Sequence, residues 1–190
     1  MSTPNPAIRY SYDDYKCLSN ATDKRYELLG GDLLMVPSPT TSHQQVAGNL
    51  FLDLAQFVRL NNLGKVFYAP MDVVFGEGAR REVAQPDIFF VSRARFGIIA
   101  EGEIRGAPDL VVEILSPRTE SLDRGYKKAL YARHGVKEYW IVSPQTKNIE
   151  VYGIGSGGLI PLGQYKLGER LLSPLLPGFT PALDEVFDVQ

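Results

Sequence analysis

Residues 110–115 read LVVEIL, and this run marks a strand at the centre of the molecule. A nearly continuous series of apolar, β-favouring residues is typical of a strand that is buried on both faces of a sheet. The single acid in the run, Glu113, is unusual there, because burying a carboxylate is costly unless a cation or a metal compensates it. Glu113 is therefore the first candidate for a functional site.

Other predicted strands and helices follow one another on both sides of this strand. The pair Gly30-Gly31 is a strong signal for a two-residue hairpin turn. Ser42 is expected to cap a long helix, and Gly135 to end a later one. The order predicts an α/β (α+β) fold with a mixed central β-sheet flanked by helices. The strands are expected at 26–29, 32–36, 65–68, 73–75, 87–91, 110–115, 138–142 and 149–152, and the helices at 11–19, 43–61 and 121–134.

Length and composition indicate an ordinary globular chain. The 190 residues fit one domain with one core, spanning 1–190. Within it we expect an N-terminal helix and hairpin at 10–37, a catalytic core at 42–153 and a C-terminal wrap at 159–190. No apolar run is long enough to span a membrane, and no signal peptide is evident. The one cysteine, Cys17, excludes an internal disulfide, so we expect a cytoplasmic protein without a membrane partner.

The distribution of charge bears on nucleic acid as a partner. A formal net charge of -2 argues against a chain coated in basic residues. The window 80–137, however, holds eleven Lys and Arg against eight acids, so it carries +3 and the remainder -5. Arg118 and Arg124 lie in that window at the start of a predicted helix, and both are candidates for phosphate contacts. A mixed, solvated surface would give the same counts.

Several familiar motifs are absent from the sequence. There is no Gly-x-Gly-x-x-Gly or Walker-type loop, which leaves nucleotide cofactors without support. There is no His-Glu-x-x-His or Cys-x-x-Cys, so a zinc site is not expected. A Ser/His/Asp triad stays open because His43 and His134 are present, although no Gly-x-Ser-x-Gly elbow accompanies them.

A second acid stands at the start of a neighbouring strand. Asp87 follows Pro86 and begins the apolar run IFFV. Two carboxylates on adjacent strands repel each other, and a divalent cation such as Mg²⁺ relieves that repulsion. Either residue alone has an ordinary explanation, since Pro-Asp pairs occur in turns and Glu113 could pair with a buried base. Together they favour a site.

A lysine is the third candidate. Asp123, Lys127 and Tyr131 follow one another at helical spacing and share one face of the predicted helix. Lys127 could position a water, or take its proton if the pKa of the lysine is lowered. The alternative is an ordinary Asp123–Lys127 surface pair, worth only ~0.3–0.5 kcal/mol.

Two further residues are weaker candidates. Glu27 lies on a hairpin strand and could reach a metal or a water, or could equally be a solvated carboxylate. His43 lies in the first turn of the long predicted helix, where a plain polar role is as natural as a phosphate contact.

The motifs in their order resemble the Uma-type endonuclease-like family, which belongs to the PD-(D/E)xK nuclease superfamily with the restriction-endonuclease fold. The resemblance extends from about Tyr26 to Phe187. Single motifs such as Pro-Asp are weak, and it is their order that is specific. The segments are YELLGGDLL (26–34), SPTTSHQQVAGNL (38–50), QPDIFFV (85–91), PDLVVEILSP (108–117), DRGYKKALYARHGVKEYWIV (123–142) and a closing Pro-Gly-Phe (177–179).

The resemblance implies a mixed sheet flanked by helices and metal-dependent hydrolysis of phosphodiesters. It implies that Asp87 and Glu113 are the two metal-binding acids and that the carbonyl of Ile114 is a further ligand. Glu27 matches an acid found early in the fold. Gln85 and His43 could line the site.

One departure from the superfamily pattern concerns the lysine. The pattern places it two residues after the second acid, where this chain has Leu115. The resemblance implies that Lys127 replaces it from the following helix. Lys128 is the adjacent alternative, but it points about 100° away.

The leading hypothesis is a deoxyribonuclease that depends on Mg²⁺ or Mn²⁺, in which Lys127 orients water or stabilises developing charge. A second hypothesis is a catalytically inactive module that binds nucleic acid or protein, motivated by Leu115. A third is a hydrolase of a small phosphodiester. We also expect a homodimer, because cutting both strands of DNA usually requires two sites.

Overall fold

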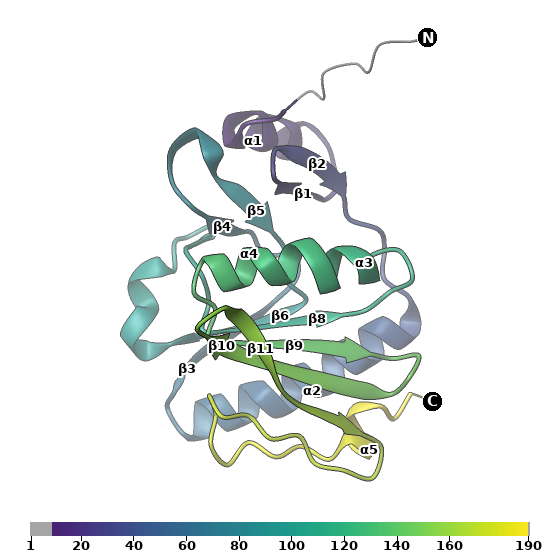
Figure 1. The fold of residues 1–190 in the computed structure, drawn as a ribbon. Coiled ribbons are helices and arrows are strands. Elements are labelled where there is room, and N and C mark those ends of the chain that lie inside the picture. The colour runs from purple at the N-terminus through teal and green to yellow at the C-terminus, as the bar shows by residue number, and fades with distance from the viewer. Residues whose placement is uncertain (1–8, 190) are drawn as a thin grey trace.

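The computed structural model describes residues 9–189, and the predicted domain bounds at 1 and 190 lie outside them. Its larger sheet has six strands in the order β11-β10-β9-β8-β6-β3 (Figure 1). Strands β8 and β9 run parallel, and all other neighbours run antiparallel. The strands are β3 (Gly64–Tyr68), β6 (Ile88–Ser92), β8 (Leu110–Ile114), β9 (Glu138–Ser143), β10 (Asn148–Gly155) and β11 (Gly158–Lys166).

The predicted central strand is confirmed. All five residues of β8 are buried, and the strand lies between β6 and β9. Its side chains alternate between two cores, as the pleat requires. Leu110, Val112 and Ile114 join the core beneath α2 (Thr41–Leu60), whereas Val111 belongs to the core beneath the opposite helix. Glu113, between Val112 and Ile114, consequently points to the face opposite α2.

A second sheet was not predicted as a separate layer. The hairpin strands β1 (Tyr26–Leu29) and β2 (Asp32–Met35) join β4 (Val73–Phe75), β5 (Glu82–Ala84) and β7 (Ile104–Arg105) in the order β2-β1-β5-β4-β7. The prediction of a single central sheet is therefore incomplete, although the α/β (α+β) class with mixed sheets is confirmed. Strands β5 and β7 are too short for a pattern of alternating residues to reveal.

The helices also differ locally from the prediction. Helix α2 is capped by Thr40, whose side chain accepts from the His43 N–H at 3.2 Å, so the Ser42 cap was wrong. Thr40 has the extended backbone that a cap requires, and Ser42 already lies inside the helix. The predicted helix at 121–134 is confirmed only as a composite of α3 (Glu120–Leu122), the π-helical segment η3 (Asp123–Lys127) and α4 (Lys128–Arg133). Gly135 ends it with φ of 80°, as expected.

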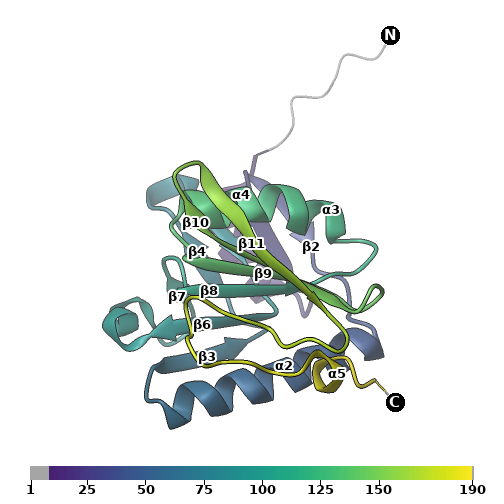
Figure 2. The same cartoon turned by 60° about the horizontal axis from the view of Figure 1, so that its bottom comes forward.

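The C-terminal part differs most from its prediction. The wrap was expected from 159, but residues up to Lys166 form β11, an edge strand paired along its length with β10. The segment that follows runs across the α2 side of the sheet and ends in α5 (Leu183–Val186), as Figures 1 and 2 show. The buried carboxylate of Glu138 fixes it, accepting bonds from Ser173 Oγ at 2.6 Å and Leu175 N at 2.9 Å.

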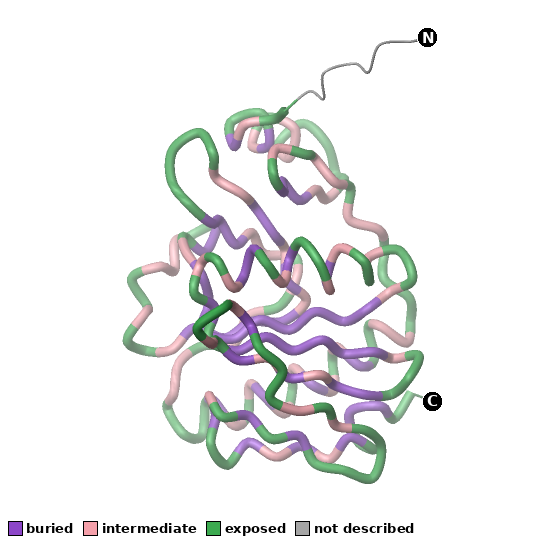
Figure 3. Tube along the Cα trace, in the orientation of Figure 1, coloured by how far each residue is buried: buried purple, intermediate pink, exposed green. Residues whose placement is uncertain are grey.

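The remaining elements are short or peripheral. Helix α1 (Tyr12–Ala21) covers the smaller sheet. Two segments of 3-10 helix complete the list: η1 (Gly78–Arg80), a single turn, and η2 (Arg93–Ile98), about two turns. Burial is concentrated in the strands of both sheets (Figure 3). Within residues 9–189, no helix combines the length and the apolar character that crossing a bilayer requires.

Candidate active site

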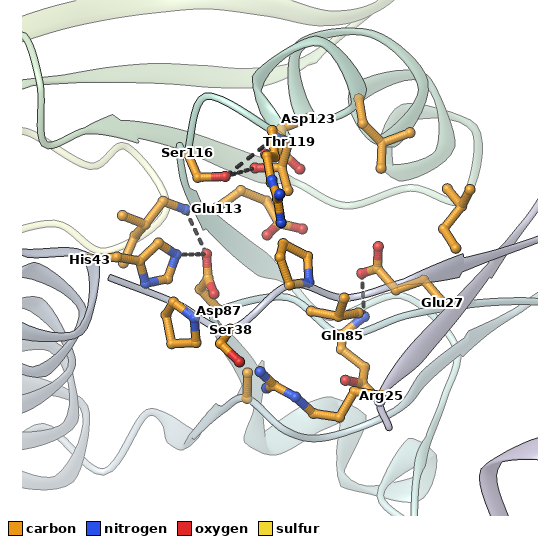
Figure 4. A pocket seen from close by; sticks show the side chains of 18 of the residues that line it. Arg25, Glu27, Ser38, His43, Gln85, Asp87, Glu113, Ser116, Thr119 and Asp123 are labelled. Atoms are coloured by element: carbon orange, nitrogen blue, oxygen red, sulfur yellow. Dashed lines mark hydrogen bonds and ion pairs between the residues drawn. The ribbon is translucent and has the colours of Figure 1, made fainter. Parts of the chain in front are cut away.

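The two acids predicted from adjacent strands lie together. Strand β6 pairs antiparallel with β8 through Ile88 and Val112, so the next position along, Asp87, comes opposite Glu113. The Ile114 N–H donates to Asp87 Oδ2 at 2.8 Å and fixes that carboxylate. Glu113 is only 3% exposed. Both side chains border the same pocket, which Figure 4 shows from close by.

Lys127 reaches this pair from the helix. Its Nζ lies 3.1 Å from Glu113 Oε1, 2.9 Å from Glu27 Oε1 and 3.4 Å from Asp123 Oδ1. Lys128, the adjacent alternative, points elsewhere, with its Nζ 3.5 Å from the centre of the Tyr152 ring. Of the two lysines, only Lys127 therefore meets the acids.

Two neighbours of Lys127 belong to the same cluster, although no site role was predicted for them. Asp123 is 1% exposed, which overturns the alternative of an Asp123–Lys127 surface pair. The Tyr131 hydroxyl donates to Glu113 Oε1 at 2.5 Å. The shared helical face of these three residues was the available signal, but nothing in the sequence showed that the face points inward.

Glu27 is brought to the cluster by the second sheet. It extends from β1, and its Oε1 accepts the Gln85 backbone N–H at 2.8 Å. The Gln85 side chain instead donates from Nε2 to Asp72 Oδ1 at 2.9 Å. Gln85 borders the pocket and holds Glu27 through its main chain. Side chains from both sheets therefore meet at Lys127, because Glu27 comes from the smaller sheet and Glu113 from the larger one.

His43 approaches from the first turn of α2. Its Nε2 lies 3.2 Å from Asp87 Oδ2, and its Nδ1 is buried without a hydrogen-bond partner among the described residues. Burial alone would lower the pKa of His43, but the hydrogen bond and charge of Asp87 outweigh it and raise that pKa. His43 is placed to hold Asp87.

The electrostatics of the cluster keep Lys127 charged. Burial alone would lower the pKa of Lys127, but the charges of Glu113, Glu27 and Asp123 outweigh it and raise that pKa well above its usual value. Taking a proton from water would need a lowered pKa, and the raised pKa of Lys127 does not meet that condition. Positioning and charge stabilisation are the roles compatible with a permanent ammonium group.

The carboxylates, in contrast, carry more charge than the lysine balances. Burial, opposed by Lys127 and reinforced by Asp123 and Asp87, raises the pKa of Glu113. Glu27 also lies in the cluster, so three carboxylates contact the one ammonium group. This donor set fits a divalent cation, since oxygen ligands and excess negative charge are what Mg²⁺ requires. In the part of the chain described, no three His, Cys, Asp or Glu side chains are already arranged as a metal cage.

A cavity of 480 Å³ opens beside the cluster. Arg118, a predicted phosphate contact, borders it, and so does Arg25, for which no role was predicted. Arg124 does not border it. Its guanidinium pairs with Glu120 at 2.8 Å and Glu150 at 2.9 Å, on the side of the helix that faces β10.

The fold and the sequence were compared with known proteins. A family model described as "Uma2: Putative restriction endonuclease" matches residues 12–189. The crystal structure of a nuclease described as putative, belonging to DUF820 and from Anabaena variabilis, superposes with a TM-score of 0.69. It is 20% identical, and the match covers 87% of this chain and 91% of that one.

A curated relative matches over a shorter stretch. The uncharacterized protein slr1290 of Synechocystis sp. (strain ATCC 27184 / PCC 6803 / Kazusa) is 40% identical over 65 residues. Those residues are 34% of this chain and 34% of that protein, so the chain matches about a third of the relative's length.

Proposed function

We infer that this chain, which belongs to the Uma2 family, is an endonuclease that hydrolyses DNA phosphodiesters with the aid of Mg²⁺ or Mn²⁺. The observation that carries this proposal is the convergence of Asp87, Glu113 and Lys127 beside a cavity, from two adjacent strands and one helix. The description of the family and the fold of the Anabaena variabilis nuclease support the same reaction class.

Each residue of the cluster has a role in this proposal. Asp87 and Glu113 would hold the cation, with the Ile114 carbonyl as a further ligand. When bound, the cation supplies Lewis-acid polarisation of the phosphate and a source of hydroxide near neutral pH. Lys127 stabilises the negative charge that develops on the phosphate, because its ammonium group stays protonated. Glu27 tunes the position of that ammonium group at 2.9 Å.

The surroundings of the cluster serve binding and alignment. His43 holds Asp87 at 3.2 Å, and Gln85 holds Glu27 through its main-chain N–H. Arg118 borders the cavity and is exposed, which suits a phosphate contact at the entrance. Arg124 already pairs with two carboxylates. It would contact the substrate only where DNA extends beyond the cavity.

The test is a cleavage assay on plasmid and single-stranded DNA with Mg²⁺, Mn²⁺ or chelator. We expect cleavage that depends on the metal and falls by at least about 10²-fold in Glu113→Gln. Glu101→Gln is the matched control, because Glu101 is an exposed acid that does not line the cavity. Unchanged activity in an Asp87→Asn, Glu113→Gln double variant would reject the proposal.

An inactive module of the same fold is the second candidate. It is favoured by Leu115, which packs into the hydrophobic core where the superfamily pattern has its lysine. DNA retention without divalent-metal binding in calorimetry would support this reading, and metal-dependent turnover would reject it. The reading as a hydrolase of small phosphodiesters predicts instead that activity does not depend on polymer length.

The remaining parts of the proposal rest on the sequence. We propose a homodimer, because cutting both strands of DNA usually requires two sites, and a cytoplasmic location. Light scattering of the purified chain tests the first, and cell fractionation tests the second.

A further inference from the structure

The Tyr131 hydroxyl and the Lys127 ammonium group share one oxygen of Glu113. Tyr131 donates to Glu113 Oε1 at 2.5 Å, and Lys127 Nζ lies 3.1 Å from the same atom. The other oxygen, Oε2, meets no donor among residues 9–189. Of the side-chain atoms in that range that are fully buried without a hydrogen-bond partner, none belongs to Glu113, so Oε2 is open to the cavity that Glu113 borders. Glu113 therefore keeps one oxygen for a ligand.

Asp87 is held in the same way, through one oxygen. Its Oδ2 accepts the Ile114 N–H at 2.8 Å and pairs with His43 Nε2 at 3.2 Å, as the dashed lines in Figure 4 show. Its Oδ1 has no hydrogen-bond or ion-pair partner in the described part of the chain, and the side chain is 20% exposed. Asp87 and Glu113 come from neighbouring strands and border one cavity. Two oxygens without a competing proton donor are thus left where a hard divalent cation would find its ligands.

Packing fixes the position of the Tyr131 hydroxyl. The side chain is fully buried, and its ring centroid lies 5.7 Å from that of Phe75 and 5.2 Å from that of Tyr139. Tyr131 follows Lys127 by four residues, so both donors project from one side of the helix. Because the ring cannot move, its hydroxyl reaches only an acceptor close to its present place. A bond from so rigid a donor limits the rotation of the Glu113 carboxylate.

The neighbouring tyrosine shows that burial alone does not require this contact. A buried tyrosine hydroxyl needs a hydrogen-bond partner, and a backbone carbonyl is sufficient. The Tyr139 hydroxyl has such a partner, the Asp123 carbonyl at 3.1 Å. The Tyr131 hydroxyl instead donates to a carboxylate that a lysine already contacts. The second donor adds little to the neutralisation of Glu113, but it fixes which of the two oxygens faces the cavity.

We propose that Tyr131 is a positioning residue of the site: with Lys127 it holds Glu113 by Oε1, so that Oε2 faces a divalent cation shared with Asp87 Oδ1. This inference rests on the proposed function. It adds the residue that orients one ligand and the oxygen that each acid presents. Partners that orient a metal ligand typically contribute roughly 10–100-fold to metal affinity or activity.

Titration calorimetry with Mn²⁺ measures metal affinity without reference to cleavage. We expect Tyr131→Phe to bind Mn²⁺ about tenfold more weakly than the wild type, because the substitution removes the hydroxyl and keeps the packed ring. Glu113 and Asp87 are still present in this variant, so binding is weakened and not abolished. In the cleavage assay, raising the Mn²⁺ concentration should therefore restore the rate of Tyr131→Phe, which a misfolded site would not allow.

The matched control is Tyr139→Phe. Tyr139 is equally buried and also loses a hydroxyl hydrogen bond, but its acceptor is a carbonyl and not a carboxylate. That acceptor, Asp123 O, still receives the Lys128 N–H, so the helix keeps its own bond there. Tyr139→Phe should bind Mn²⁺ like the wild type. Equal Mn²⁺ affinity in Tyr131→Phe and the wild type, or equal losses in the two variants, would overturn the inference.

A crystal structure of the wild type with Mn²⁺ tests the choice of oxygens without any variant, and so decides the inference even if Tyr131→Phe does not fold. We expect the cation on Glu113 Oε2 and Asp87 Oδ1, with the Tyr131 hydroxyl still on Oε1. A cation on Oε1, with the Tyr131 hydroxyl displaced, would overturn the inference.

The failure of this inference differs from the failure of the proposed function. If the wild type binds no Mn²⁺, both are wrong. If the wild type binds Mn²⁺ and cleaves DNA while Tyr131→Phe binds Mn²⁺ equally well, only the role of Tyr131 is wrong.

Discussion

Replacing Lys127 by Met should destabilise the protein strongly, and by an amount that depends on pH. Met keeps the volume of the lysine stem but removes the ammonium group that contacts Glu27, Glu113 and Asp123 within 3.4 Å. Removing one partner from a buried ionic cluster costs about 3–5 kcal/mol, because the other charges are left without compensation. We expect a loss of this size in the free energy of unfolding at pH 8.

The loss should become smaller in acid. Because its pKa is raised, Lys127 itself stays protonated and does not titrate between pH 5 and 8, so any change over this range comes from the carboxyl groups. In the variant, the uncompensated carboxyl groups gain protons as the pH falls, which removes their repulsion. The difference between wild type and variant should accordingly shrink between pH 8 and pH 5.

Urea denaturation followed by tryptophan fluorescence measures both effects. Trp140 is the single tryptophan of the chain and is fully buried, so its emission reports on the core. Lys128→Met is the matched control, since Lys128 contributes only a cation–π contact with Tyr152, worth ~0.5–1 kcal/mol. Equal losses in the two variants, or a Lys127→Met loss that does not change with pH, would mean that Lys127 does not balance buried charge.

Three further predictions concern stability. Glu138→Ala should cost about 3 kcal/mol or more, because the Trp140, Ser173 and Leu175 donors lose their acceptor, and limited proteolysis should cleave the C-terminal segment faster than in the wild type. Asp109→Asn should make stability less dependent on pH in acid. Burial alone would raise the pKa of Asp109, but Lys137 and Ser92 outweigh it and lower that pKa, so the contribution of Asp109 is present above about pH 4 and is lost below it. Unfolding measurements at pH values from 2 to 6 would report the difference. Gly135→Ala should cost about 1–2 kcal/mol in thermal or chemical unfolding, because φ of 80° is unfavourable for alanine.

The central sheet and the pair of acids could be predicted because local sequence carries them. The apolar residues around Glu113 predict a buried strand, and Asp87 directly precedes a second strand that is also apolar and mostly buried. The Gly30-Gly31 turn requires positive φ at both residues, 58° and 84°, which glycine tolerates. Each of these features is set by residues close together in the chain.

The second sheet and the inward side of the helix could not be predicted in the same way. Strand β5, at Glu82–Ala84, exists because β1 and β4 lie on either side of it, which is a tertiary condition. The burial of Asp123 depends on how η3 packs against the sheet, and its π-helical turn has no clear local signature. Arg25 was missed because its place beside the cavity follows from the tertiary fold and not from a motif.

Crystals soaked in Mn²⁺ give the most direct test of the central claim, that Asp87 and Glu113 form a metal-dependent site completed by Lys127. Anomalous scattering locates the cation without reference to activity. We expect one peak between the two carboxylates, within a few ångströms of the Lys127 Nζ, and we expect it to disappear in Glu113→Gln. Two results would contradict a metal site at these residues. One is the absence of a peak between Asp87 and Glu113 while Lys127 still contacts Glu113. The other is a peak elsewhere that is unchanged in Glu113→Gln.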